Sequence, residues 1–525
     1  MISARELTAY VSLAAVLAFI FSCGTPHGAW RAWTFDTDIE GDSRAKDGNP
    51  AFEIEKIPDF GRYRPLRILS EEEFPLDTSD RRVIIVGDIH GMWKPFRQLL
   101  SKVDYASTSD VLVHAGDFLA KGPHHHSMAI LNYMTINNIT GVRGNHDQHV
   151  VEWRGWINWV SSSKEGLDWL KRTEHHWKVL HGNHPADSRG LDDDLDDFVQ
   201  SQKDKAPSKD RRWWKLIPAG WKFLSGQYRI AREMSEEQYE YLLQLPTALY
   251  VPSAHAFVVH AGILPSDPNY PYYDASRQPL AHIPDVFPSI TEKDRLCRGS
   301  KFRCTNQLRQ AQEMSILTDV PQNRRPWVLM NMRGVKNGKV FRQYRGVFWA
   351  KLWNRDMKRC VGYNGELASL DSDDEESEGK PKAHNLPCYP STVVYGHSAS
   401  RGLSIKRWTM GLDSGCVYGR KITALVMGGS RSKHTLEGDG DSPPFLGVDD
   451  VDEAGSSSED DEEDDAEYDF VDGFDDHADD SEDSSSHRPA SADTLLKKRK
   501  KKKKDGDNVP FGGHHRATIV SVKCH

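Results

Sequence analysis

The chain has 525 residues, of which 38% are hydrophobic and 28% are charged. A chain of this length can bury at least one large core, but so low an apolar fraction excludes that all of it is core, so we expect one domain with long solvated segments. Residues 431–525 carry 26 acidic and 13 basic residues, whereas the other 430 residues carry 55 basic and 51 acidic ones. The net charge of −9 therefore comes from this C-terminal segment, and the rest of the chain is slightly cationic. A slightly cationic body suits an anionic substrate.

The first 24 residues are predicted to target the chain to a membrane. Arg5 precedes a stretch from Leu7 to Cys23 whose only polar residues are Ser, Thr and Tyr. Its length lies at the short end of the spanning range, so a signal anchor and a cleaved signal peptide are both open. We favour the anchor because no convincing cleavage site follows, and a buried core helix is the third alternative. A single-pass anchor would place the body in the lumen of a secretory compartment.

Strands that alternate with helices are predicted from Arg82 onward, after an irregular lead-in over residues 25–80. Apolar runs predict strands at 82–87, 110–116 and 140–144, separated by helices at 93–103 and 124–134. This alternation indicates parallel βαβ units and an α/β fold. A helical cap insert is expected at 151–244, which is too polar for a sheet, and four more strands are predicted at 256–262, 391–397, 409–415 and 420–427.

An acidic loop at 365–387 interrupts the catalytic body, which we place at 81–428. The composition of 429–525 predicts a disordered tail, first acidic and then basic. Its run from Lys497 to Lys504 is typical of a nuclear-localisation signal, a solvated linker or a tether for polyanions. The seven cysteines permit disulfides in a secretory compartment, and Cys360 and Cys388 bracket the acidic loop, but free thiols are the alternative.

Polar side chains follow five of the predicted strands at the point where each strand ends, in GDIHG, GDFLAKGP, GNHD, HAG and GHS. Ligands at the C-terminal ends of neighbouring strands converge on one crevice. Carboxylates, imidazoles and a neutral oxygen donor suit two divalent ions about 3.5–4 Å apart. The sequence therefore predicts a dinuclear metal site with the candidate ligands Asp88, His90, Asp117, Asn145, His260 and His397.

These motifs resemble those of the calcineurin-like metallophosphoesterases of the phosphoprotein-phosphatase superfamily, over about 82–262 and 391–428. Protein phosphatases carry Asp-Arg before the glycine of the second motif, where this chain has Ala120 and Lys121. That difference, with NMRG at 331–334 and GLDSGCVYGRKITAL at 411–425, resembles the branch of symmetrical diadenosine-tetraphosphate hydrolases (ApaH-like). Relatives of this branch include fungal vacuolar endopolyphosphatases, which are zinc-dependent and membrane-anchored, and the N-terminal segment is similar to their anchor.

The resemblance implies a metallophosphoesterase β-sandwich with flanking helices, and it implies how the ligands are shared. Asp88 and His90 would hold one ion, Asp117 would bridge both ions, and the other three candidates would hold the second. Imidazole-rich ligation favours zinc, with manganese, iron or cobalt as alternatives.

The resemblance also implies two catalytic residues, Asp117 and His146. His146 would protonate the leaving oxygen as a general acid. Ala120 cannot orient this histidine as the aspartate of protein phosphatases does, so its partner stays open, with Asp147 as a guess. Charge on the phosphate oxygens needs fixed cations, for which the candidates are Lys121, Arg143 and Arg333.

We therefore expect a hydrolase of acid anhydrides, an endopolyphosphatase that cleaves inorganic polyphosphate by a metal-activated hydroxide. It would act at a vacuolar or other secretory-pathway membrane, with no specific nucleic-acid partner. The alternatives are a serine/threonine phosphoprotein phosphatase, a diadenosine-polyphosphate hydrolase and an inactive scaffold with a phosphoesterase fold. The complete ligand set disfavours the scaffold, and Ala120 with Lys121 disfavours the protein phosphatase. The metal, the length of the substrate and internal against terminal cleavage stay open.

Overall fold

The computed structural model describes residues 57–78, 80–181, 191–286, 301–365, 367, 384–428 and 505–524. All of them belong to one compact unit, Ile57–His525. The predicted membrane segment 1–24, most of the lead-in, most of the acidic loop and the run Lys497–Lys504 lie outside the described residues. Among the helices of the described part, none combines the length and the apolar character that a membrane crossing requires.

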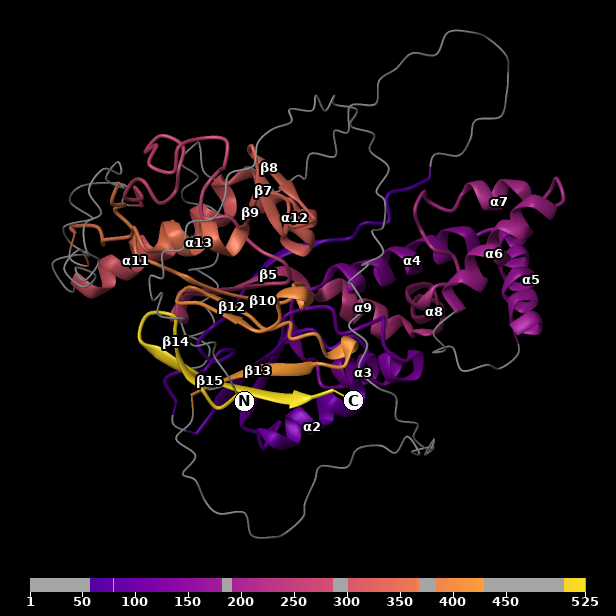
Figure 1. The fold of residues 1–525 in the computed structure, drawn as a ribbon, viewed down its shortest axis with the longest axis horizontal. Coiled ribbons are helices and arrows are strands. Elements are labelled where there is room, and N and C mark those ends of the chain that lie inside the picture. Colours follow the sequence, from indigo (N-terminus) through magenta and orange to yellow (C-terminus); the bar gives the residue numbers. More distant parts are fainter. Residues whose placement is uncertain are drawn as a thin grey trace, which may run out of the picture. The chain divides into compact units, whose positions relative to one another are not determined.

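One six-stranded sheet carries the predicted βαβαβ motif (Figure 1). Its order is β14-β15-β13-β2-β3-β4, with the bounds Asn508–Phe511, His515–Lys523, Lys421–Gly428, Arg82–Val86, Asp110–His114 and Thr140–Gly141. The strands β2, β3 and β4 run parallel, and the helices α2 (Trp93–Lys102) and α3 (His124–Ile136) connect them. The three strands and two helices predicted for this part of the chain are confirmed.

The second six-stranded sheet has the order β1-β5-β6-β10-β12-β11, with the bounds Arg64–Ile68, Pro246–Val251, Ala256–Val259, Thr392–Tyr395, Thr409–Gly411 and Ser404–Ile405. The later predicted strands are observed as β6, β10, β12 and β13. Three strands of this sheet were not predicted: β5, β11 and β1, the last of which lies inside the lead-in that was predicted to be irregular. β1 is an edge strand with exposed ends, so its apolar pattern is weak. A small third sheet has the order β8-β7-β9, with the bounds Lys339–Phe341, Gly334–Lys336 and Val347–Phe348.

Apolar side chains pack between the two large sheets and on the outer face of each. Val83 and Ile85 of β2 pack with Val258 and Val394 of the other sheet, so the two sheets enclose a common core. Helices α2 and α3 cover the outer face of the β2 sheet, and the helices of the segment 151–244 continue the same apolar cluster beside them (Figure 1). These helices, α4 to α9, span Asn145–Ser161, Lys164–His181, Leu191–Lys205, Arg211–Lys215, Gly226–Glu233 and Glu236–Gln244. The other sheet is covered by α11 (Lys301–Asp319), α12 (Pro326–Asn331) and α13 (Trp349–Met357). Because β2 is covered on both faces, its sequence is a continuous apolar run.

The C-terminal residues 505–524 contain two strands, so the predicted disorder of 429–525 is wrong for this part. β15 pairs antiparallel with β13 from Lys421↔Lys523 to Met427↔Ala517, and the two lie side by side in Figure 1. Ile519 faces the core between the sheets, whereas Val520 packs against the helical side. The prediction of disorder was based on the average composition of the whole tail. A strand depends instead on a local alternation of apolar and polar residues, which that average does not reveal.

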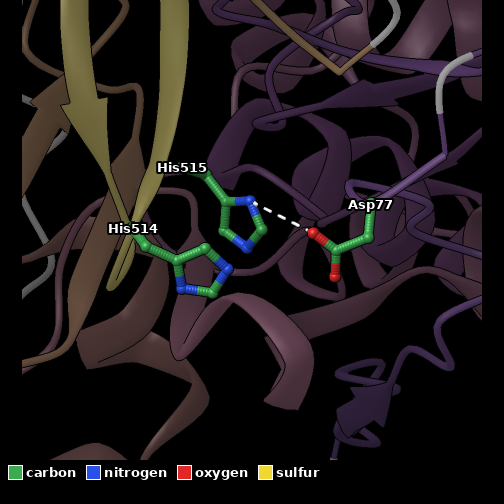
Figure 2. Close-up of side chains that lie close together, drawn as sticks. All are labelled: Asp77, His514 and His515. Carbon is green, nitrogen blue, oxygen red and sulfur yellow. Dashed lines mark ion pairs between the residues drawn. The ribbon is translucent and has the colours of Figure 1, made fainter.

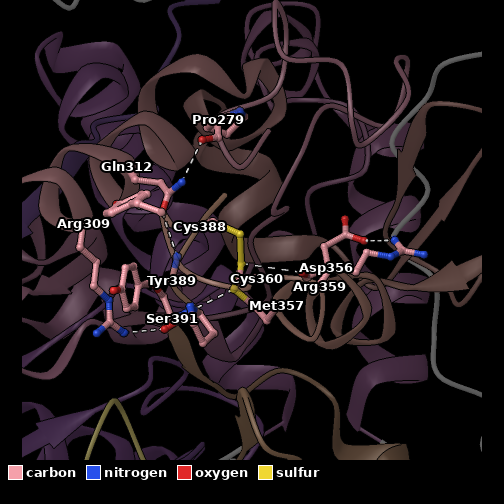
Figure 3. Close-up of a disulfide and its surroundings, with 12 residues drawn as sticks. Pro279, Arg309, Gln312, Asp356, Met357, Arg359, Cys360, Cys388, Tyr389 and Ser391 are labelled. Carbon is pink, nitrogen blue, oxygen red and sulfur yellow. Dashed lines mark hydrogen bonds and ion pairs between the residues drawn. A yellow bond between two sulfur atoms is a disulfide. The ribbon is translucent and has the colours of Figure 1, made fainter. Parts of the chain in front are cut away.

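Two disulfides join described cysteines. One connects Cys360 to Cys388, which bracket the predicted acidic loop. Figure 3 shows it beside Ser391, whose backbone N–H donates a hydrogen bond to the sulfur of Met357 at 3.3 Å. The other connects Cys416, in the 3-10 helix η4 (Cys416–Tyr418), to Cys524 just after β15. The free-thiol alternative is therefore wrong for these four cysteines.

Candidate active site

The six predicted metal ligands come together at the carboxyl ends of strands from both sheets. The backbone turns sharply after each strand, so each side chain leaves the sheet close to its neighbours. All six are buried. They are Asp88 and His90 after β2, Asp117 after β3, Asn145 after β4, His260 after β6 and His397 after β10.

Asp117 belongs to both of the groups of potential ligands at this place. One group is Asp88, His90 and Asp117, and the other is Asp117, His260 and His397, with the ligand atoms of each group within 4.8 Å of one another. His90 Nε2 lies 3.9 Å from Asp88 Oδ2 and 3.8 Å from Asp117 Oδ2. His260 Nε2 lies 3.1 Å from Asp117 Oδ2. The Asp117 carboxylate thus lies where a bridging ligand would be needed.

The backbone at this edge adopts conformations that ordinary residues avoid. His90, Asp117 and His397 have φ angles of 48°, 50° and 66°. Left-handed backbone at non-glycine residues costs about 1–3 kcal/mol each and clusters at functional sites. Gly144 and Gly396 are required for a different reason, because a Cβ at either would overlap the carboxylate of Asp117 or Asp88.

The electrostatics of the six side chains suit a divalent cation. Burial, Asp413 and Asp117 together raise the pKa of Asp88 well above its usual range. Burial alone would raise the pKa of Asp117 as well, but the facing imidazoles, His260 first, lower it well below its usual range. Burial also lowers the pKa of His90 to about 3. Buried carboxylates beside imidazoles are a donor set for zinc, manganese, iron or cobalt, so the residues fit the predicted metal centre.

His146 lies beside this centre, and its partner is not the one guessed from the sequence. Its ring is 5.2 Å from the His90 ring, and its backbone N–H donates to Asp117 Oδ1 at 2.9 Å. The carboxylate of Asp147 instead accepts the backbone N–H groups of Asp117, Leu119 and Gly144. Asp147 therefore braces the loop that carries Asp117.

The side chain that contacts the His146 ring is Gln227 of α8, with its Nε2 3.2 Å from His146 Nδ1. Sequence reasoning missed it, because 81 residues separate the pair and no motif spacing connects them. Asp413 in the GLDSG motif was also missed as a buried carboxyl near Asp88. Its motif was noticed, but only as a mark of resemblance.

The three predicted phosphate-binding cations have different surroundings. Lys121 contributes to lowering the pKa of both His90 and His146, so its ammonium acts on the centre, and its Nζ donates to the hydroxyl of Tyr418 at 3.2 Å. Arg333 is 8% exposed and donates to the backbone carbonyl of His397 at 3.0 Å. This contact braces the loop that carries a candidate metal ligand.

The structure contradicts a phosphate-binding role for Arg143. Its side chain is fully buried. It donates to the carbonyl groups of Arg62, Leu243 and Leu245 and to the side chain of Gln148. Its terminal nitrogens are thus engaged inside the protein, and the residue joins three segments of the fold.

A cavity of about 340 Å³ opens beside Asn145, one of the predicted metal ligands. Aromatic side chains line much of it, and Arg342 contributes a positive charge. The aromatic lining residues are Phe60, Tyr63, Trp221 and Trp327. Planar aromatic walls are the kind of surface on which a nucleobase stacks.

Comparisons with known proteins bear on the family of this chain. Residues 81–256 match the model of the calcineurin-like phosphoesterases, so the predicted resemblance is confirmed for this segment. A symmetrical bis(5'-nucleosyl)-tetraphosphatase of Haemophilus ducreyi is 44% identical over 69 residues, which are 13% of this chain and 25% of that protein. Serine/threonine-protein phosphatase 1 of Salmonella typhimurium is 33% identical over 92 residues, 18% of this chain and 42% of that protein.

The chain thus spans a quarter to less than half of the length of these relatives. A solved Saccharomyces cerevisiae protein serine/threonine phosphatase with similarity to human phosphatase PP5 covers 70% of this chain and 78% of its own, at 14% identity and a TM-score of 0.27. So low a score supports no inference. The segment 81–256 includes the ligands from Asp88 to Asn145, whereas His260 and His397 lie beyond it and are joined to the site by the tertiary structure.

Proposed function

We propose that this chain is a metal-dependent phosphoanhydride hydrolase and that its substrate is inorganic polyphosphate, cleaved at internal bonds. The observation that carries the proposal is the position of Asp117, which is shared by two groups of buried potential metal ligands. Two groups with one common carboxylate are the arrangement that a two-metal site for phosphoryl transfer requires.

The residues that would hold the ions are the six at the strand ends. When bound, a pair of divalent ions supplies Lewis acidity toward phosphoryl oxygens and lowers the pKa of water. The ammonium group of Lys121 adds a positive charge that acts on His90 and His146. It would bind oxygens of the substrate next to the attacked phosphorus.

His146 is proposed to give a proton to the leaving oxygen. The amide of Gln227 donates a hydrogen bond to His146 Nδ1. Because Nδ1 then acts as the acceptor, the neutral ring carries its proton on Nε2. Burial lowers the pKa of His146 well below its usual range, so the ring is neutral and this one proton is the one available. The Nε2–H of the neutral ring donates a hydrogen bond that stabilises the charge developing on the leaving oxygen. Complete transfer of a proton requires that the ring first take up a second proton, so that a neutral imidazole is left behind.

Two features support an anhydride over a phosphoserine substrate. An internal phosphoanhydride carries negative charge on both sides of the scissile bond, so it benefits from cations beyond those on the attacked phosphate. Lys121 acts on the centre, and Arg342 contributes to lowering the pKa of His397 while lining the cavity. The similarity to bis(5'-nucleosyl)-tetraphosphatases points in the same direction.

A second candidate is a hydrolase of dinucleoside polyphosphates. The aromatic lining of the cavity beside Asn145 favours it, because stacking of a base on an aromatic ring is worth about 1–3 kcal/mol. Inorganic polyphosphate has no group that would use this surface.

To test the proposal, the full chain is supplied with zinc and incubated in parallel with three substrates: long-chain polyphosphate, diadenosine tetraphosphate and a phosphoserine peptide. We expect polyphosphate to be shortened to intermediate lengths and the peptide to be untouched. Faster turnover of diadenosine tetraphosphate than of polyphosphate would favour the second candidate. Hydrolysis of the peptide alone would refute both.

A variant separates the two candidates further. Tyr63→Ala should raise KM for diadenosine tetraphosphate by about fivefold to a hundredfold if a base stacks in the cavity, and should leave polyphosphate cleavage unchanged. Tyr273→Ala is the matched control, since both tyrosines are partly exposed, at 38% and 48%. If both variants have the same KM as each other on each of the two substrates, the argument for a nucleoside substrate is removed.

We also propose that the body works in the lumen of a secretory compartment such as the vacuole. The disulfides Cys360–Cys388 and Cys416–Cys524 support this, because stable disulfides are a feature of oxidising compartments. The proposal predicts that the chain isolated from its cell carries both bonds, as peptide mass mapping without reduction would show. Free thiols at these positions would contradict it.

A further inference from the structure

A second group of potential metal ligands lies away from the candidate active site. It consists of Asp77, in the loop before β2, and His514 and His515, at the start of β15. Their ligand atoms lie within 4.8 Å of one another. Figure 2 shows the two imidazoles side by side, with His515 facing the carboxylate of Asp77.

The group lies at the opposite end of the sheets from the active site. Asp77 precedes the first residue of β2, whereas Asp88 and His90 follow its last residue. The register places Ala517 of β15 beside Met427 and Met427 beside Val83, so His515 lies near the beginning of β2. A five-residue strand spans about 17 Å, so the two groups cannot share an ion.

The distance between His515 and Asp77 is longer than a hydrogen bond and close to the separation of two ligands of one zinc ion. His515 Nδ1 and Asp77 Oδ1 are 3.7 Å apart, beyond the usual range of about 2.7–3.2 Å for a hydrogen bond. The histidine–carboxylate pair His124 and Glu233, by contrast, closes to 2.7 Å. Bonds of about 2.0–2.2 Å to a tetrahedral zinc place two ligand atoms roughly 3.3–3.6 Å apart. The spacings of His90 to its two carboxylates, 3.9 and 3.8 Å, are similar.

The scaffold holds the two histidines in place. The turn before them contains Gly512, which has a φ of +56° and packs so closely on the carbonyl of Ala254 that no Cβ would fit. The His515 side chain is 9% exposed, and its ring lies 4.0 Å from that of His514. The carboxylate of Asp77 is 77% exposed, which leaves an open side for a water ligand.

We propose that Asp77, His514 and His515 bind one zinc ion, which fastens the C-terminal hairpin to the loop before β2. Two imidazoles and one carboxylate suit zinc, nickel or copper and do not suit magnesium or calcium. β15 would then be fastened at both ends, by the ion at His515 and by the disulfide of Cys524.

The test counts zinc bound by the full chain over a range of buffered free zinc, by elemental analysis. We expect His514→Ala/His515→Ala to bind one zinc ion fewer per chain than the unmodified protein. The matched control is His125→Ala/His126→Ala, another pair of consecutive histidines, whose rings are 4.2 Å apart but which belong to no such group among the described residues. The control should bind as much zinc as the unmodified chain, and magnesium in place of zinc should show no difference between the variants.

Asp77→Asn is the second variant, chosen because an exposed side chain can change without disturbing the fold. We expect about tenfold weaker binding of this one zinc ion, and polyphosphate hydrolysis at saturating zinc within twofold of the unmodified chain. Equal zinc counts in the double histidine variant and the unmodified chain would overturn the proposal. If that double variant fails to fold, unchanged zinc affinity in Asp77→Asn overturns it as well.

Discussion

At the scale of single residues, Asp117 is the side chain on which most of the candidate site depends. It faces His260 and His90, and its own backbone N–H is held by Asp147. We predict that Asp117→Asn lowers hydrolysis by several orders of magnitude, because the amide weakens the one ligand that both groups share. Turnover and bound metal are to be measured together. Asp196→Asn, at a surface ion pair with Lys222, is the control. Retention of more than about a tenth of the activity would contradict the two-metal assignment.

Gln227 is the residue that the tertiary structure adds to the site. We predict that Gln227→Ala lowers turnover of polyphosphate roughly two- to tenfold, the value of one lost hydrogen bond of about 0.5–1.5 kcal/mol. An aryl phosphate with a good leaving group needs little protonation, so its hydrolysis should change far less.

Gln202→Ala provides the matched control for Gln227→Ala. Gln202 also contacts a histidine in the helical segment, His176, at 3.1 Å, but on the surface. Gln227→Glu should not restore the lost activity, because an ionised carboxylate can only accept a hydrogen bond and would draw the ring proton to Nδ1. If Gln227→Ala slows both substrates equally, the residue does not act through protonation of the leaving group.

At the scale of elements, the C-terminal strand β15 completes the β2 sheet and is held by a disulfide. The bond Cys416–Cys524 closes a loop of 108 residues, and Cys360–Cys388 one of 28. By the chain-entropy relation, closing the longer loop stabilises the fold by about 4.8 kcal/mol and closing the shorter one by about 3.6 kcal/mol. We predict that Cys524→Ser lowers the free energy of unfolding more than Cys388→Ser does, as urea unfolding would measure. A smaller effect of Cys524→Ser would mean that β15 stays docked in the unfolded ensemble or is held mainly by other contacts.

At the scale of the whole molecule, the charged tail lies between two strands that neighbour the same partner. β13 ends at Gly428 and β14 begins at Asn508, and both are adjacent to β15. A linker of about ten residues, roughly 33 Å when extended, can therefore replace 431–504 without breaking the sheet.

We predict that this replacement leaves turnover unchanged and lowers the apparent KM for polyphosphate at low salt. The removed residues are predominantly acidic and would repel an anionic substrate. The difference should shrink as salt rises, because screening weakens the repulsion. Initial rates at two salt concentrations measure this, with removal of 431–525 as the control that should unfold the chain. A rise in KM would instead show that the lysine run from Lys497 to Lys504 tethers the substrate.

The sequence alone determined the order of the central elements and the identity of the six candidate ligands. Strands β2 and β3 are mostly apolar on both faces, so their runs are long enough to recognise, and each of the three strands is followed by a polar motif. His260 and His397 could be added because they too end apolar runs. These signals lie within short stretches of the chain, so they can be recognised in the sequence without knowledge of the fold.

Only the tertiary structure decided which polar residues serve the site and which serve the fold. Arg143 and Lys121 belong to neighbouring motifs, yet the arginine is enclosed by carbonyl groups of distant segments while the lysine acts on the centre. Gln227 reaches His146 across 81 residues, and β15 reaches β13 across a strongly acidic stretch. Contacts of this kind depend on how helices and sheets pack, and the free energy of packing depends on the shapes of surfaces that no single stretch of sequence contains.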